Sequence, residues 1–325
     1  MQNAMVNKEG KNNNNFKNLL VEYKSLVGLL GLVIVVALLS PSFLTVNNIL
    51  NVLRQTSVNA IIAAGMTFVI LTGGIDLSVG SILGFSGAIA AYSIASGQNI
   101  VIAVLLALVV GTGIGFINGV VISKGKLQPF IATLASMTIL RGATLVFTDG
   151  KPITIGSEGV ALAFGKIGGG SIIGIPTPAL MMIAVFVVCY YILSQTKIGR
   201  YTYALGGNEE ATKLSGLDTD KIKIFAYTVS GILAAVAGII ITSRLFSAQP
   251  NAGDGYELDA IAAVVLGGTS LAGGKGKITG TIIGALIIGI LSNALNLLDV
   301  SSYFQMIAKG IVILIAVLAD RKGAK

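Results

Sequence analysis

Four amide side chains recur every four residues along one stretch of the chain: Asn47, Asn51, Gln55 and Asn59. Residues four apart lie on the same face of an α-helix, so these amides would form one polar stripe with Arg54 beside it. An amide both donates and accepts hydrogen bonds, which suits a hydroxylated solute as well as a polar group on a neighbouring helix. The stripe is therefore a candidate solute pathway or a set of interhelical hydrogen bonds.

Asp76 lies in the stretch TGGIDLS, residues 72–78, between two apolar segments. Gly73 and Gly74 can end the preceding helix. Asp76 and Ser78 can then cap the next helix, where a carboxylate satisfies unpaired N–H groups. The alternative is a broken helix beside a solute pathway, because irregular backbone at membrane depth survives only inside protein or along a water-filled cavity. Both roles stay open for Asp76.

Two cations lie inside apolar stretches, Arg141 in SMTILRGATLVF and Lys309 in FQMIAKGIVIL. A cation at the centre of a membrane costs about 2.5–3.5 kcal/mol on insertion scales, so each needs a partner or a cavity. The candidate partners are the acidic residues Asp254, Glu257, Asp259 and Asp299. Ion pairing is the structural interpretation for both cations, and Arg141 is also a candidate pathway residue.

The side-chain inventory excludes several kinds of chemistry. The chain has no His, and Cys189 is its only Cys, which excludes His-based triads, metal sites of His or several Cys, and intrachain disulfides. The pattern G-x-x-x-x-G-K-[ST] is absent, so the chain does not bind ATP through a P-loop of its own. We expect no catalytic residue, no metal site and no cofactor in this chain.

The composition is that of an all-α integral membrane protein. Hydrophobic residues make up 54% of the 325 residues and charged residues only 11%, against about 25% in typical soluble domains. Apolar runs of about 18 or more residues are candidate transmembrane helices. The sequence predicts about ten transmembrane or re-entrant helices, of which 179–194 and 258–272 are short. The candidate spans are 26–40, 49–71, 79–96, 100–122, 130–147, 179–194, 224–242, 258–272, 278–297 and 303–319.

The net charge of +8 is distributed unevenly between the two sides of this arrangement. If ten segments cross, most Lys and Arg residues fall in alternate loops on one side, and only Lys151, Lys166 and Arg244 fall on the other. The positive-inside rule then predicts that both termini are cytoplasmic, and the pattern does not favour nucleic acid as a partner. We expect a cytoplasmic tail at 1–25, one transmembrane domain at 26–320 and a short cytoplasmic tail at 321–325.

Three connecting loops are long. The cytoplasmic loop 195–223 contains Asn208, EEATKLS and Gly216, which predicts a short capped helix with a glycine stop; it is either a solvated linker or a docking element. The external loops are 148–178 and 243–257. Segments 69–84 and 264–284 also share an apolar run, a Gly-rich break and a G-[ST]-I-[LI]-G resumption, which is a weak repeat.

Four long segments together resemble the membrane permeases of bacterial simple-sugar ABC importers. They are NAIIAAGMTFVILTGGIDLSVGSILGFSGA, IGRYTYALGGNEEATKLSG, SAQPNAGDGYELDAIAAVVLGGTSLAGGKGKITGT and SSYFQMIAKGIVILIAVL, and the resemblance runs from about Lys24 to the C-terminus. It implies a permease of the bacterial cytoplasmic (inner) membrane that forms the translocation pathway as a homodimer. The resemblance favours ribose as the solute, with xylose, galactose and autoinducer-2 as alternatives.

The same resemblance implies partners for this chain besides sugar, membrane lipid and a second permease copy. A separate cytoplasmic ATPase would bind ATP and Mg, and an extracytoplasmic ribose-binding protein would dock on the external loops. The ATPase would grip the coupling loop, for which the candidate residues are Gly206, Gly207, Asn208, Glu209, Glu210, Ala211 and Gly216. The motif E-A-A-x-x-x-G is matched in part, because Thr212 replaces its second Ala.

Two other functional classes compete with a permease driven by a separate ATPase. The first is a stand-alone secondary transporter coupled to protons or sodium, against which the lack of a ladder of intramembrane carboxylates counts. The second is an integral membrane enzyme, which the absence of His and the single apolar Cys189 argue against.

Overall fold

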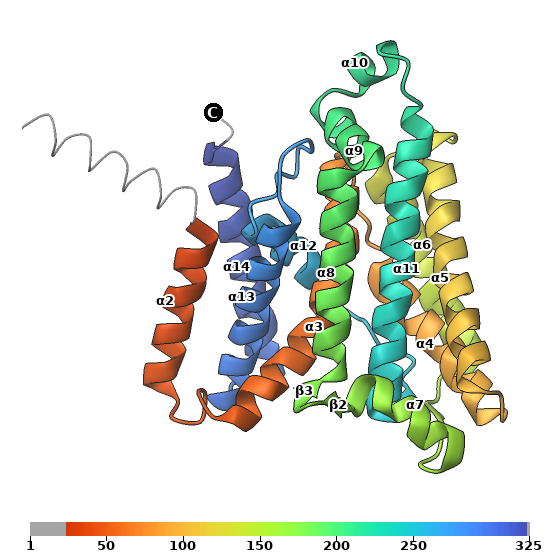
Figure 1. The fold of residues 1–325 in the computed structure, drawn as a ribbon, viewed down its shortest axis with the longest axis vertical. Coiled ribbons are helices and arrows are strands. Elements are labelled where there is room, and N and C mark those ends of the chain that lie inside the picture. The colour runs from red at the N-terminus through yellow and green to blue at the C-terminus, as the bar shows by residue number, and fades with distance from the viewer. Residues whose placement is uncertain (1–23, 324–325) are drawn as a thin grey trace, which may run out of the picture.

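The computed structural model describes residues 24–323, and these form a bundle of helices with very little β-structure (Figure 1). The longer helices run between two opposite ends of the bundle. The helices are α2 (Lys24–Leu39), α3 (Val46–Leu71), α4 (Val79–Ala95), α5 (Ile100–Ser123), α6 (Pro129–Thr148), α7 (Gly159–Gly169), α8 (Thr177–Gln195), α9 (Lys197–Gly207), α10 (Glu209–Leu214), α11 (Thr219–Leu245), α12 (Tyr256–Leu266), α13 (Ile278–Leu297) and α14 (Ser302–Gly323). The two small antiparallel sheets pair β1 (Ile153–Thr154) with β4 (Ser247–Ala248) and β2 (Ser171–Ile172) with β3 (Ile175–Pro176).

Within the described residues, six helices are long and apolar enough to cross a membrane: α3, α5, α6, α8, α11 and α13. The predicted all-α membrane fold is confirmed, whereas the total of about ten membrane helices stays a prediction. The short predicted span 179–194 lies within the full-length helix α8. The predicted helix at 258–272 is wrong in its extent, because α12 ends at Leu266 and a glycine-rich loop follows.

The two ends of the bundle differ in charge. The described start of α2 and the end of α14 lie at the same end as α9 and α10 (Figure 1). Several basic residues lie at this end too. Lys124, after α5, and Lys221, at the start of α11, line one surface hollow. The loop that contains Lys275 is held at the end of α3, where Gly274 donates a hydrogen bond to the carbonyl of Leu71. By the positive-inside rule this end is cytoplasmic. The predicted tail 1–25 lies outside the described residues except for its last two, which begin α2. Of the predicted tail 321–325, the first three residues continue α14 and only 324–325 lie outside the described residues.

The long helices α3 and α11 occupy the middle of the bundle and run in opposite directions (Figure 1). Each is followed by a non-helical segment, 72–78 or 246–255, and then by a shorter helix, α4 or α12; the second segment includes the short strand β4. The segment 264–284, which shares a pattern with 69–84, forms the end of α12, a loop and the start of α13. The repeat between these two segments stays a prediction.

The start of α4 meets the second interruption at Gly80 and Gly253. A Cβ atom added to either glycine would collide with the carbonyl oxygen of the other, so both positions require glycine. Gly253 also has φ of +76°, a conformation in which a side chain is strained. This contact fixes the start of α4 against the segment that leads into α12.

Glycines on α5 also let α11 approach closely. Cβ atoms at Gly111, Gly115 and Gly119 would meet backbone atoms of α11, including the carbonyl of Gly231. Small residues are the usual means of close helix packing in membranes, where lipid is as apolar as the side chains. α11 is thereby held between α5 on one side and α3 and α4 on the others.

The predicted short helix in the cytoplasmic loop is confirmed as α10. The side chain of Asn208 accepts a hydrogen bond from the N–H of Ala211 at 2.9 Å, and Gly216 adopts φ of +82° after the helix ends. Asp218 caps the next helix, α11, by accepting from the N–H of Lys221 at 3.1 Å. Hydrogen bonding to Lys221 holds the pKa of Asp218 below its usual value.

Candidate functional site

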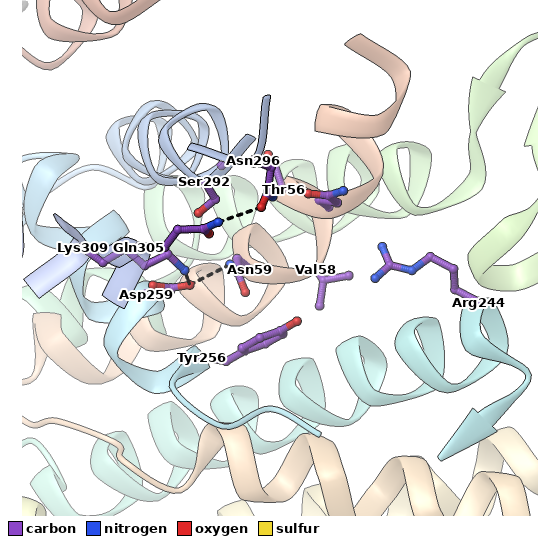
Figure 2. Close-up of a pocket in the computed structure, with 12 residues that line it drawn as sticks. Thr56, Val58, Asn59, Arg244, Tyr256, Asp259, Ser292, Asn296, Gln305 and Lys309 are labelled. Carbon is purple, nitrogen blue, oxygen red and sulfur yellow. Dashed lines mark hydrogen bonds and ion pairs between the residues drawn. The ribbon is translucent and has the colours of Figure 1, made fainter. Parts of the chain in front are cut away.

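A polar cavity of about 250 Å³ lies among α3, α11, α12, α13 and α14 (Figure 2). It lies in the half of the bundle away from α9 and α10, because the end of α11, the end of α13 and the start of α14 line it. Its lining residues are Gln55, Thr56, Val58, Asn59, Arg244, Tyr256, Asp259, Gly289, Ser292, Asn296, Gln305 and Lys309. Amides, hydroxyls and charges dominate this set, although the surrounding helices are apolar.

Asp259 forms the centre of the polar group. It lies in the first turn of α12 and is only 5% exposed. One carboxylate oxygen, Oδ2, accepts a hydrogen bond from Lys309 Nζ at 2.8 Å and a longer one from Asn59 Nδ2 at 3.3 Å (Figure 2). The ion pair neutralises two charges that would each be costly in a membrane. The predicted ion pairing of Lys309 with an acidic residue is thus confirmed, with Asp259 as the partner.

The remaining polar groups of the cavity are only partly engaged. Gln305 Nε2 donates to Asn296 Oδ1 at 2.8 Å and to the carbonyl of Val300 at 2.9 Å. Thr56 Oγ1 and Asn59 Oδ1 are buried and have no hydrogen-bond partner among the described residues. Arg244 lies on the opposite side of the group from Lys309 (Figure 2).

The predicted amide stripe divides along α3. Gln55 and Asn59 line the cavity, whereas Asn51 accepts a hydrogen bond from Arg54 Nη1 at 3.3 Å outside the lining. The pathway role of these four residues stays a prediction. Sequence reasoning missed Asn48, one residue out of the stripe, which exchanges two hydrogen bonds of 3.0 and 2.9 Å with Asn293 on α13.

Asp76 lies in a separate, closed polar network and does not line the cavity. Its side chain is 0% exposed; Oδ1 accepts from the N–H of Ser78 at 3.0 Å and from its hydroxyl, and Oδ2 accepts from Ser230 Oγ at 2.8 Å. Asn118 donates to Ser78 Oγ at 2.9 Å and so joins α5 to the network. Asp76 accepts from the N–H of Ser78, the residue just before α4, and no side chain accepts from the first N–H groups of α4, so the predicted side-chain cap is wrong in detail. The carboxylate instead ties the segment before α4 to α11 and, through Ser78, to α5.

Arg141 binds the second interruption and also lies outside the cavity lining. Its Nη1 donates to the carbonyl of Ala252 at 2.7 Å, and its Nη2 lies 3.8 Å from Asp254. The prediction that Arg141 has an acidic partner is confirmed. Arg141, on α6, thus holds the segment 246–255 in place through its contacts with Ala252 and Asp254.

Several cavity residues were not predicted as site residues, among them Arg244, Tyr256 and Ser292. Asp259 and Lys309 were visible in the sequence as charges near or inside apolar stretches. Their shared cavity was not visible, because it depends on how α12 and α14 approach α3. Among the described residues, no group of three or more His, Cys, Asp or Glu side chains is placed to hold a metal ion.

The predicted coupling-loop residues lie together at the cytoplasmic end, on α9, on α10, in the turn between them and, for Gly216, in the turn after α10. Glu209 pairs with Lys223 at 2.6 Å, while Glu210 and Ala211 are exposed and Leu214 is 89% exposed. Gly206 packs on the end of α3, where an added Cβ would collide with the carbonyl oxygen of Leu71 and the nitrogen of Gly274. The loop thus combines an exposed outer face with a backbone contact to α3.

Comparison with known proteins identifies the family. The family described as branched-chain amino acid transport system / permease component matches residues 48–317. The chain is 61% identical to the ribose import permease of Haemophilus influenzae over 93% of each chain, and 58% identical to that of Escherichia coli K12 over 93% of this chain and 94% of the relative. It is 57% identical to the ribose import permease of Bacillus subtilis over 91% of each chain.

More distant relatives include the D-allose transport system permease of Escherichia coli, at 40% identity over 89% of each chain. No solved structure matches the chain. The six apolar helices and the permease relatives both indicate a membrane transport protein. The chain belongs to this family of transport-system permeases and is a multi-pass protein of the bacterial cytoplasmic membrane.

Proposed function

We propose that this chain is the membrane permease subunit of an ATP-driven importer for ribose. The observation that carries the proposal is the 57–61% identity to three ribose import permeases over nearly the whole chain, against 40% for the D-allose permease and 38% for an L-arabinose permease. The permease itself is not an enzyme and uses no cofactor. A separate cytoplasmic ATPase binds ATP and Mg and drives transport.

The structure supports movement of a polar solute. Irregular backbone at 72–78 and 246–255 and a polar cavity among apolar helices are tolerated in a membrane only where they face protein or water. Such interrupted helices line the solute sites of many transporters. In the proposed importer two permease copies form the channel, and an extracytoplasmic ribose-binding protein delivers the sugar at 148–178 and 243–257.

The proposed ATPase contact is the outer face of α9 and α10, from Gly206 to Gly216. The exposed Leu214 gives this face an apolar anchor that a partner groove can bury. In the predicted single transmembrane domain, 26–320, this face belongs to the cytoplasmic loop 195–223.

The test is co-purification of the permease from native membranes in a mild detergent, followed by an ATPase assay with and without ribose-loaded binding protein. We expect an ATPase to co-purify and ribose-loaded binding protein to stimulate it, whereas the same protein loaded with xylose or galactose would not. A permease that purifies without an ATPase, in a detergent that preserves a known ABC complex, would contradict the proposal. Uptake that collapses with an uncoupler but survives ATP depletion would favour a secondary transporter.

A second measurement locates the ATPase contact. Replacing residues 209–216 with a Gly-Ser linker should abolish ATPase co-purification while the permease still elutes as a monodisperse species. The single change Leu214→Asp should weaken co-purification in the same direction. Retention of the ATPase by the linker variant would place docking elsewhere on the cytoplasmic face.

A further inference from the structure

Asp259 and Asn59 have hydrogen-bonding capacity that the protein does not use. Both hydrogen bonds to Asp259 reach Oδ2, and its Oδ1 accepts none from the described residues. Asn59 Oδ1 is buried and also lacks a partner. An unpartnered buried polar group costs about 1–3 kcal/mol, and this applies to Asn59 Oδ1. Together with the unused oxygen of Asp259 in the same cavity, it favours a bound molecule that donates to both acceptors.

The charges of the cavity favour an uncharged molecule. Lys309 neutralises Asp259 at 2.8 Å, so neither residue strongly attracts a free ion of the opposite sign. Arg244 adds a cation on the side of the cavity away from Asp259 and Lys309, where its N–H groups can donate to a hydroxyl oxygen (Figure 2). A cation is disfavoured by Lys309 and Arg244 together.

The remaining lining residues favour a molecule with several hydroxyl groups. Each hydroxyl both donates and accepts, and the cavity offers acceptors at Asp259 and Asn59 together with donors at Lys309 and Arg244. Tyr256 supplies a ring that can cover the C–H face of a sugar. The cavity volume of about 250 Å³ is just below the usual range of about 300–1,000 Å³ for small-molecule sites, which suits one small monosaccharide.

We propose that this cavity is a sugar-binding site of the permease itself, in which Asp259 Oδ1 and Asn59 Oδ1 accept hydrogen bonds from neighbouring hydroxyls of an aldopentose. Lys309 and Arg244 donate to the sugar oxygens from opposite sides. The inference rests on the proposed function for the identity of the sugar and adds the place where the permease holds it. Binding is weak, because a solute in transit must leave as readily as it enters.

The test uses the single native cysteine. Cys189 is buried, so the unmodified permease gives a low background with a membrane-impermeant thiol reagent. Ser292→Cys places a reactive thiol in the cavity, and Ser301→Cys places one on an exposed residue outside it. Labelling rates are measured in right-side-out vesicles that carry the whole importer but no binding protein, with ribose, xylose, ribose 5-phosphate or no addition.

We expect millimolar ribose to slow labelling of Ser292→Cys several-fold and to leave Ser301→Cys unchanged. Adding Asp259→Asn to Ser292→Cys should remove the protection, while the labelling rate without sugar shows that the cavity still forms. Ribose transport with no protection of Ser292→Cys would overturn the sugar site and leave the proposed function standing. Protection by another pentose but not by ribose would support the site and contradict ribose as the substrate. Protection by ribose 5-phosphate alone would overturn the site as one for neutral sugars.

Discussion

The two interrupted helix pairs each carry a buried aspartate near the start of their short helix, and the two aspartates have very different surroundings. Asp76 is 0% exposed, and both of its oxygens accept hydrogen bonds from serines on its own segment and on α11. Asp259 is 5% exposed, uses one oxygen and faces a cavity. Two buried aspartates near the start of a short helix thus do different things: one carboxylate holds helices together, and the other keeps an oxygen available.

The largest expected effect is on the stability of the folded permease, which should depend on Asp76 much more than on Asp259. Asp76→Leu leaves Ser78 and Ser230 without their acceptor in a site closed to water, at a cost of about 1–3 kcal/mol for each buried group. Asp259→Leu leaves Lys309 beside a cavity that water can fill. We expect Asp76→Leu to lose most of the monodisperse permease in size-exclusion chromatography and Asp259→Leu to keep it. Equal losses would abolish the distinction between the two residues.

The next effect tests whether the contact between α9 and the end of α3 matters for transport. Gly206 contacts the end of α3 so closely that Gly206→Ala must displace the carbonyl of Leu71, which accepts a hydrogen bond from Gly274 at 3.0 Å. Gly207→Ala is the matched control, because an added Cβ there meets nothing within 4 Å. We expect Gly206→Ala to retain the ATPase in co-purification but to lower uptake about tenfold, the change produced by about 1.4 kcal/mol. Equal uptake by the two variants would show that this contact does not carry movement to α3.

A smaller effect is expected for the amide pair at the extracytoplasmic end of α3. Asn293→Leu removes both hydrogen bonds to Asn48, in a region of partly buried helix packing. Hydrogen bonds between membrane helices contribute about 0.6 kcal/mol on average and at most about 1.7 kcal/mol. The melting temperature should fall by a few degrees, with little loss of monodisperse protein. A collapse as large as that of Asp76→Leu would show that the two networks do not differ in importance.

The smallest effect is expected at the cytoplasmic surface. Glu209 and Lys223 form an ion pair of 2.6 Å, with the carboxylate half exposed. Exposed ion pairs contribute about 0–1 kcal/mol, so Glu209→Gln should leave the melting temperature nearly unchanged. Loss of ATPase co-purification in this variant, at unchanged stability, would assign Glu209 to docking and not to the fold.

Local signals in the sequence predicted much of the fold. Apolar run lengths identified α3, α5, α6, α8, α11 and α13, and the Asn208 and Gly216 signals located α10. The TGGIDLS pattern also predicted the break between α3 and α4, although not the hydrogen bond of Asp76 to Ser230 on α11. The extent of α12 was wrong because its apolar run continues past Leu266 into glycines whose positive φ angles end the helix.

The candidate site was harder to predict, because its members are distant in sequence. Asp259 and Lys309 are 50 residues apart, and Asn59 and Asp259 are 200 apart. The four-residue period identified Gln55 and Asn59 as lying on a polar face. It could not show which neighbour that face meets, because the approach of α12 and α14 to α3 is set by packing over the whole bundle.

The contact between Gly80 and Gly253 has a consequence for how the protein is made. The acceptor of Arg141 at Ala252 is synthesised 111 residues after Arg141 itself, and Gly253 follows Gly80 at a still larger separation. At about 5–20 residues per second, synthesis leaves the first half incomplete for on the order of ten seconds. During that time the membrane contains an incomplete bundle in which Arg141 lacks Ala252 and Asp254 as partners. Chaperones or proteases can recognise such an intermediate. The two halves are therefore not independent insertion units, and a chain truncated before 250 should be degraded rather than accumulate.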